Sequence, residues 1–230
     1  MSRLRLVVFD VDGTLVDSEG DIFAAMVLAY EGAGHAPPAR AAVRGIVGLS
    51  LPQAVARLSP DLAGSHDALV AGYKQAYMTL RQEKGSAASS PLFPGARAAL
   101  DALRADPWTL LAVATGKSKR GLDKLIEGHG LEGYFASQQV ADFHPSKPHP
   151  AMLHAVLAET GVAAADAVMV GDTSYDMEMA RAAGLGAIGV GWGYHAPESL
   201  HADVLVQDFA ALGDAIEGVL RRRRERIVHE

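Results

Sequence analysis

The stretch LVVFDVDGTLVDS occupies residues 6–18 and stops an apolar run at two carboxylates and a glycine. Four apolar residues without alternation predict a central strand of a parallel sheet, because helices cover both faces of such a strand. Ligands of these sheets bind beyond the carboxyl ends of the strands, where Asp10 and Asp12 are expected. Gly13 permits a tight turn whose amides can face an anion, although Asp and Gly are also common in ordinary turns.

The later part of the chain alternates between expected strands and expected helices, which is typical of an α/β doubly wound parallel sheet with a Rossmann-like core. Strands are expected at 109–114, 136–140, 167–170, 187–190 and 204–206. Helices are expected at 118–129, 150–159 and 175–183, with another after Pro94-Gly95 and a last one through 209–219.

Residues 19–83 show only helical patterns. Helices are expected over 19–31, 39–46 and 67–81, the first capped by Asp17 and Ser18, and a capping box at 50–53 is expected to open a further one. The small residues of 85–91 are typical of a linker. The sequence therefore predicts a catalytic core, residues 1–17 and 88–230, interrupted by an inserted α-helical cap domain, residues 18–87.

Composition narrows the possible partners. The 230 residues are 49% hydrophobic, carry a formal net charge of −6 and include no cysteine. A negative balance argues against a nucleic-acid partner, and the absence of cysteine excludes disulfides and thiolate metal sites. No apolar run reaches the roughly 18 residues that a membrane span requires, and no secretory leader is visible. We therefore expect a cytoplasmic protein, a monomer or a homodimer, that binds a small molecule and no membrane.

Three later positions carry residue types that bind phosphate or metal ions. Thr115 and Gly116 stand where a strand gives way to a helix, so that a hydroxyl and free N–H groups can receive phosphate oxygens, although such a threonine can also be a simple helix cap. Lys147 lies in a loop that three prolines stiffen, where it can neutralise phosphate charge or stay solvated like most loop lysines. Lys117 is expected to be solvated.

Asp172 and Asp176 follow the strand expected at 167–170. They could serve only as carboxylates at a helix N-terminus. Together with Asp10 and Asp12, however, they supply oxygen ligands suited to Mg²⁺, which would relieve the repulsion among carboxylates at one sheet edge. A metal site at His144 and His149 is disfavoured, because no other His or Cys ligand set accompanies them and proline breaks the helical face that such pairs use.

These four motifs, in this order, resemble those of the haloacid dehalogenase-like hydrolase superfamily. The resemblance implies that Asp10 is the nucleophile that forms an aspartyl-phosphate and that Asp12 is the general acid and then the base. It implies that Thr115 and Lys147 hold the phosphoryl group. Mg²⁺ would be held by the Asp10 carboxylate, the Asp12 main-chain carbonyl and Asp172, with Asp176 orienting a metal-bound water or Lys147.

Within this family, Asp12 favours phosphate chemistry, because the dehalogenases lack the second aspartate. Mutases carry a histidine roughly where Asp21 and Ile22 stand here, so its absence disfavours a mutase. The string at 17–22, DSEGDI, resembles phosphoglycolate phosphatases. We expect a phosphoric monoester hydrolase acting on phosphoglycolate or another small phosphorylated metabolite, with sugar phosphates, nucleotides, pyrophosphate and a non-catalytic phosphate-binding module as alternatives. Arg44 could meet a substrate carboxylate, or be an ordinary surface arginine.

Overall fold

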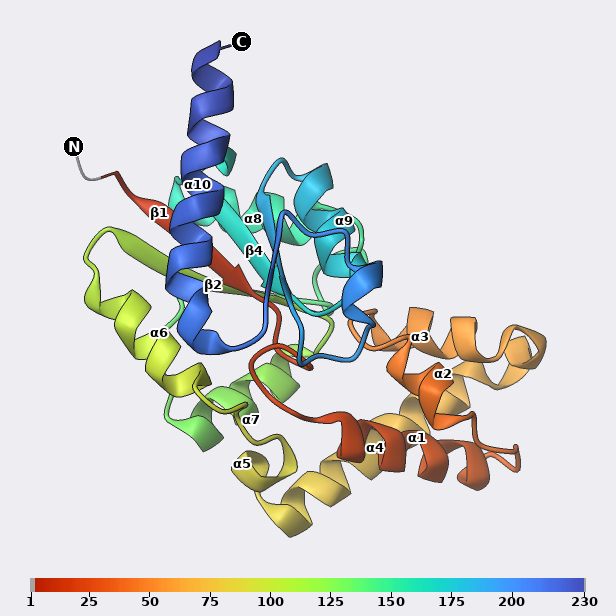
Figure 1. Cartoon of the computed structure of the whole chain (residues 1–230). Helices are drawn as coiled ribbons and strands as arrows, with labels where there is room; N and C mark the ends of the chain where they lie inside the picture. Colours follow the sequence, from red (N-terminus) through yellow and green to blue (C-terminus); the bar gives the residue numbers. More distant parts are fainter. Residues whose placement is uncertain (1–2, 230) are drawn as a thin grey trace.

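The apolar run before Asp10 forms the strand β1 (Arg5–Phe9), and a computed structural model describes residues 3–229 of the chain (Figure 1). β1 pairs in parallel with two neighbours, so that both its edges are covered. The six strands form one parallel sheet in the order β3-β2-β1-β4-β5-β6. The remaining strands are β2 (Thr109–Thr115), β3 (Ser137–Val140), β4 (Ala167–Gly171), β5 (Gly186–Val190) and β6 (Val204–Val206). The predicted doubly wound sheet is confirmed.

Alternate residues of the strands point to opposite faces of the sheet, and each face is covered by helices. Val7 and Phe9 of β1 pack in an apolar cluster with α6, α7 and α10, whereas Leu6 and Val8 pack in a second cluster with α8 and α9. The bounds of these helices are α6 (Ala96–Ala105), α7 (Lys119–His129), α8 (Ala151–Thr160), α9 (Ser174–Ala182) and α10 (Leu212–His229). Because β2 and β4 flank β1, the chain changes direction across the sheet at the carboxyl end of β1, where such folds bind ligands.

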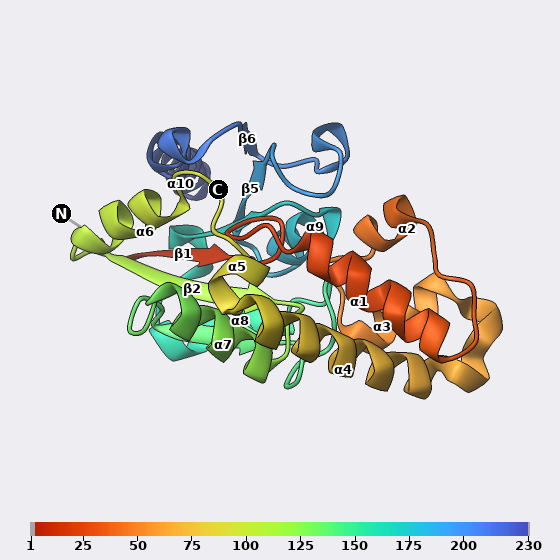
Figure 2. The ribbon, with the colours of Figure 1, turned by 90° about the horizontal axis from the view of Figure 1, so that it is seen from below.

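Between β1 and β2 the chain forms a separate group of helices, the cap helices, that lies beyond the carboxyl edge of the sheet (Figures 1 and 2). They are α1 (Glu19–Gly32), α2 (Arg40–Arg44), α3 (Leu51–Leu58), α4 (His66–Lys84) and α5 (Ser86–Ser89). α1 and α4 pack along each other (Figure 2), and an apolar cluster with Met26, Tyr30 and Leu69 lies between the cap helices. The domain boundaries at 17/18 and 87/88 stay a prediction.

Three local predictions in this region were wrong. Ser50 precedes α3, but its side chain makes no cap hydrogen bond, so the predicted capping box is absent. Ser18 precedes α1 without capping it, because its hydroxyl is bonded to Asp12 instead, although the other predicted residue, Asp17, accepts from the Glu19 backbone N–H at 3.4 Å. The predicted linker at 85–91 contains the short helix α5, which packs on α7. Within residues 3–229, no helix combines the length and apolarity that crossing a membrane would require.

The loop that joins α2 to α3 seats the cap helices directly on the sheet edge. The backbone N–H of Ser50 donates to Ser146 Oγ at 2.8 Å, and the Tyr175 hydroxyl donates to the carbonyl of Gly45 at 2.9 Å. A Cβ on Gly116 would lie 2.7 Å from the carbonyl oxygens of Gly48 and Leu49. Only a glycine at 116 allows the two backbones this close approach.

Candidate active site

Three aspartates from two neighbouring strand ends form one buried cluster. Asp10 follows β1, Asp172 follows β4, and Asp176 lies in the first turn of α9. One carboxylate oxygen of each lies within 4.8 Å of the others, and the exposed fraction of each residue is 1% or less. The structure therefore brings together three of the four aspartates that the sequence predicted at this edge, without the Asp12 side chain, and a buried cation lies beside them.

That cation is Lys147, whose side chain is fully buried. Its ammonium nitrogen lies 2.9 Å from Asp10 Oδ1 and 2.6 Å from Asp176 Oδ1. These carboxylates raise the pKa of Lys147 above its usual value in spite of burial, so the side chain stays charged. A buried charge requires such partners. The alternative that Lys147 is solvated, like most loop lysines, is therefore wrong.

Asp176 is held rigidly by its own helix start. Its Oδ2 accepts hydrogen bonds from the Thr173 backbone N–H at 3.1 Å and the Thr173 hydroxyl at 2.7 Å, and the Thr173 side chain in turn caps α9. A Cβ on Gly171 would lie 2.5 Å from Asp176 Cγ, so a glycine is needed beside it. Asp176 thus combines a helix-capping function with the orientation of Lys147.

Asp172 is fixed by donors that the sequence did not reveal. Thr14 Oγ1 donates to Asp172 Oδ1 at 2.8 Å, and the Tyr194 backbone N–H donates to Asp172 Oδ2 at 2.9 Å. A Cβ on Gly13 or on Gly193 would lie 2.2 Å or 2.0 Å from Asp172 side-chain atoms. Gly13, with φ +81°, is therefore required both by its backbone and by the space that Asp172 fills.

The cluster is short of positive charge. Burial raises the pKa of Asp10 to about 7, although Lys147 opposes the shift, and burial together with Asp10 and Asp176 raises the pKa of Asp172 well above its usual value. Apart from the ion pair of Oδ1 with Lys147, the carboxylate oxygens of Asp10 have no hydrogen-bond partner among the described residues. Buried, incompletely bonded carboxylate oxygens fit a hard divalent cation, which Asp10 and Asp172 would hold with Asp176 nearby.

The raised pKa of Asp10 predicts how metal-free stability depends on pH. Between 3.8 and about 7, folded Asp10 keeps a proton that the unfolded chain has released. The free energy of unfolding should therefore fall as pH rises through this interval, and Asp172 should act in the same direction. Urea denaturation in EDTA at pH 5 and pH 7 measures the difference, which Asp10→Asn should reduce. A wild-type slope no steeper than that of the variant would contradict the assignment.

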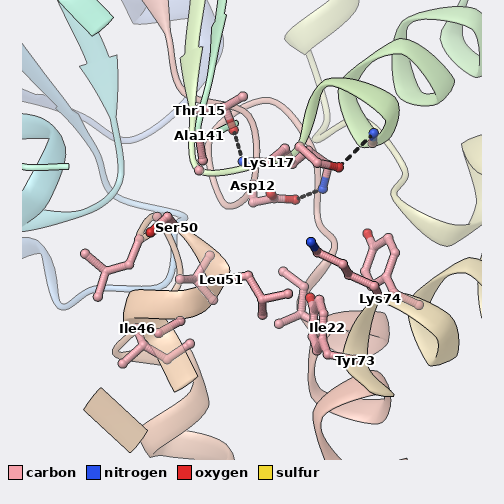
Figure 3. A pocket seen from close by; sticks show the side chains of 18 of the residues that line it. Asp12, Ile22, Ile46, Ser50, Leu51, Tyr73, Lys74, Thr115, Lys117 and Ala141 are labelled. Carbon is pink, nitrogen blue, oxygen red and sulfur yellow. Dashed lines mark hydrogen bonds and ion pairs between the residues drawn. The ribbon is translucent and has the colours of Figure 1, made fainter. Parts of the chain in front are cut away.

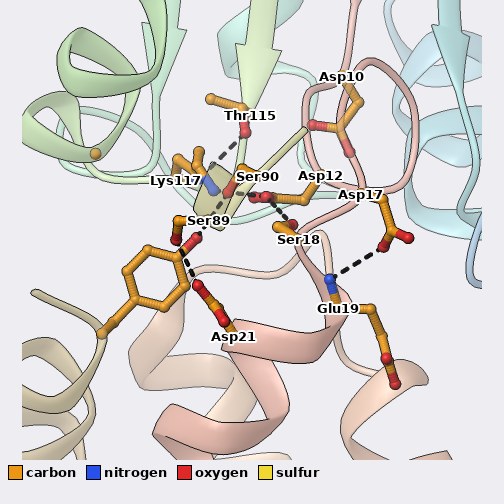
Figure 4. A network of polar contacts seen from close by, with 12 residues as sticks. Asp10, Asp12, Asp17, Ser18, Glu19, Asp21, Ser89, Ser90, Thr115 and Lys117 are labelled. Atoms are coloured by element: carbon orange, nitrogen blue, oxygen red, sulfur yellow. Dashed lines mark hydrogen bonds and ion pairs between the residues drawn. The ribbon is translucent and has the colours of Figure 1, made fainter. Parts of the chain in front are cut away.

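Asp12 lies beside the cluster and faces a different cation. Lys117 Nζ lies 2.5 Å from Asp12 Oδ1, and the Ser18 hydroxyl also donates to that oxygen (Figure 4). The prediction that Lys117 is solvated was wrong: its side chain is 10% exposed, and its nitrogen lies 5.4 Å from the centre of the Tyr77 ring. Helix α4 covers this lysine, which a local sequence pattern could not show.

The site opens into a pocket of about 610 Å³ between the sheet edge and the cap helices (Figure 3). Asp10, Asp12, Thr115 and Gly116 line it from the core. Thr115 is buried, and its hydroxyl oxygen accepts from the Lys117 backbone N–H at 3.2 Å. Thr115 and Gly116 therefore share one cavity with Asp10 and Asp12, whereas Lys147, which is fully buried against Asp10, does not line it.

Other singled-out residues lie away from this pocket. Arg44 is exposed, lies 5.9 Å from the centre of the Tyr194 ring and does not line the pocket. His144 Nε2 lies 2.7 Å from Gln139 Oε1, and His149 Nδ1 accepts from the Ala151 backbone N–H, so each imidazole has a local partner.

Comparison with known proteins supports one family. The model of the haloacid dehalogenase-like hydrolases matches residues 4–184. The probable phosphatase IndB of Dickeya dadantii is 36% identical over 94% of this chain and 95% of its own length. A phosphoglycolate phosphatase of Chromobacterium violaceum is 32% identical over 94% of this chain and 98% of its own length.

Solved structures show the same fold at lower identity. A structure described as a predicted phosphatase from Clostridium acetobutylicum has a TM-score of 0.82 at 23% identity, covering 94% of this chain and 100% of that one. The full-length sequence relatives carry phosphatase names. The chain belongs to the haloacid dehalogenase-like hydrolase family, and these relatives identify it as an enzyme of the phosphatase type.

Proposed function

We propose that the protein is an Mg²⁺-dependent phosphatase that hydrolyses a small phosphorylated metabolite through an aspartyl-phosphate on Asp10. The observation that carries this proposal is the Asp10 carboxylate, which is buried at the carboxyl end of β1 and has only the ion pair of Oδ1 with Lys147, at 2.9 Å, as a polar partner among the described residues. Such a carboxylate is free to attack phosphorus, provided that the negative charges of both reactants are offset.

In the first step an oxygen of Asp10 would attack phosphorus, and the bond between phosphorus and the ester oxygen would break. Asp12 would give the leaving oxygen its proton. In the second step Asp12 would accept a proton from a water whose oxygen attacks the phosphorus, which releases phosphate and restores Asp10. Bound Mg²⁺, held by Asp10, the Asp12 carbonyl and Asp172 with Asp176 nearby, would supply charge neutralisation between carboxylate and phosphate.

The phosphoryl group would be bound by two residues that line the pocket, Thr115 and Gly116, and by the buried Lys147. Thr115 and the backbone at Gly116 lie at the carboxyl end of β2, where a hydroxyl and N–H groups can receive phosphate oxygens. Lys147 would hold a phosphate oxygen while Asp176 keeps it oriented. Lys117, already paired with Asp12, is a second cation at the pocket floor.

Phosphoglycolate is the first substrate to test, because relatives at 32% and 34% identity bear the name phosphoglycolate phosphatase. Sugar phosphates, nucleotides and pyrophosphate are the alternatives. A mutase is disfavoured: Asp21, near the position where mutases carry histidine, binds Lys84 and lies 2.5 Å from Ser89 Oγ, which ties α5 to α1.

The test is phosphate release from these compounds by protein freed of metal and then supplied with Mg²⁺. Turnover, together with transfer of a radiolabelled phosphoryl group to Asp10, is the expected result. Binding of phosphate without any release from the panel would favour the non-catalytic alternative. Release without a labelled protein in rapid-quench samples would contradict the covalent step.

A further inference from the structure

The cap side of the pocket is wider and more apolar than a two-carbon leaving group requires. The pocket of about 610 Å³ falls within the roughly 300–1,000 Å³ of cavities that bind ligands of drug size. Its cap wall includes the side chains of Ile22, Met26, Ile46, Leu49, Leu51 and Met78. Apolar surface of this extent is best covered by an apolar part of the ligand.

Cations also line the cap side of this pocket. Tyr73, Lys74, Tyr77, Met78 and Arg81 line the cavity from one face of α4, as their helical spacing predicts. Figure 3 shows the Lys74 side chain directed into the pocket, toward Asp12.

No carboxylate oxygen among the described residues lies within ion-pair distance of Lys74, Arg81 or Arg120, and all three line the pocket. Other cations nearby do have acidic partners, as Lys84 has Asp21 and Lys119 has Asp123. The core side of the pocket therefore carries the carboxylates of Asp10, Asp12 and Asp142, and its walls are apolar. The cations without an acidic partner are Lys74 and Arg81 on α4 of the cap and Arg120 on α7 of the core.

We propose that the substrate is a phosphate monoester whose alcohol part contains an apolar body of about the size of one ring and a second anionic group that meets Lys74. This inference rests on the proposed function, because the phosphoryl group must lie at Asp10. Phosphoglycolate supplies the second anion without the apolar body, and sugar phosphates supply a polar body.

Four esters of primary alcohols separate the two features, because their leaving groups have similar intrinsic reactivity. Ethyl phosphate has neither feature, phosphoglycolate has the anion, benzyl phosphate has the ring, and 4-carboxybenzyl phosphate has both. We expect kcat/KM to be about tenfold higher for benzyl than for ethyl phosphate, and several-fold higher again for the carboxybenzyl ester.

Lys74→Met should lower the ratio of carboxybenzyl to benzyl turnover to about one, and Lys74→Arg should keep most of it. Lys124→Met is the matched control, because Lys124 pairs with Glu127 on α7, does not line the pocket, and should leave the ratio unchanged.

Equal or faster turnover of phosphoglycolate than of the carboxybenzyl ester would overturn the inference, as would a ratio that Lys74→Met does not change. Both results would leave the phosphatase function intact. Release of phosphate from a sugar phosphate, nucleotide or pyrophosphate, but from none of the four esters, would overturn the inference and leave the proposed function standing. Release from none of the compounds in either set would overturn both.

Discussion

Replacing Asp10 with asparagine should lower kcat by about 10³-fold or more while leaving the fold intact. An amide has nearly the same shape as the carboxylate but cannot attack phosphorus. The substitution also removes one negative charge from a buried cluster in which Lys147 keeps its partner Asp176 at 2.6 Å. The measurement is steady-state phosphate release at saturating Mg²⁺, with circular dichroism and thermal unfolding as checks of the fold.

Asp123→Asn is a suitable control for the Asp10 variant. Asp123 lies half-exposed on α7, pairs with Lys119 and does not line the pocket, so the same chemical change there should leave kcat unaltered. Activity of Asp10→Asn within tenfold of wild type would show that another group acts as the nucleophile.

Removing the metal should abolish turnover, and adding Mg²⁺ should both restore it and raise the melting temperature. A cation at 100 times its dissociation constant stabilises the folded state by about 2.7 kcal/mol, which corresponds to several degrees for a chain of this size. Asp172→Asn should abolish this shift, because it neutralises a ligand. Without metal the variant should be at least as stable as wild type, since the repulsion from Asp10 and Asp176 is reduced.

The thermal shift tests where the metal binds, and the activity test in EDTA shows whether turnover depends on a metal. Asp101→Asn, an exposed change on α6 that leaves the cluster untouched, should keep the full Mg²⁺ shift. A normal shift in Asp172→Asn would place the metal elsewhere. Full turnover in excess EDTA would contradict metal dependence altogether.

The sequence predicted the sheet and the carboxylate cluster because both depend on strands. An uninterrupted apolar run indicates a strand buried on both faces, and parallel strands deliver their carboxyl ends to one edge, so Asp10 and Asp172 had to lie close together. Lys147 was found by similar reasoning, because its loop follows the strand β3 and precedes the helix α8, which packs on the sheet. Its complete burial between Asp10 and Asp176 is a tertiary property that no local pattern contains.

The cap side of the site was predicted less well, because its geometry depends on how helices pack on the core. Arg44 was selected because the family resemblance suggested a substrate-facing loop there, yet it lies outside the pocket, whereas Lys74 of α4 was not selected and lines it. Lys117 was expected to be solvated because the helix that covers it is some forty residues away in sequence. The Tyr194 backbone N–H, which fixes Asp172, follows β5 and carries no signal at all in the sequence.

The hydrogen bond from Ser18 to Asp12 joins a side chain of the core to the first residue before α1. Ser18 also donates its backbone N–H to the Tyr194 hydroxyl of the core at 2.8 Å, and its own carbonyl accepts from the Ile22 N–H of α1, so it joins the core to this helix. A rotation of α1 that carries Ser18 with it would lengthen or break the bond to Asp12. Under the proposed mechanism, the proton donor is thus aligned only while the helices are seated. While the site is open, Asp12 would not be aligned to take a proton from water, so the aspartyl-phosphate would not be hydrolysed. Hydrolysis would then follow only after the alcohol has left and the helices have closed again.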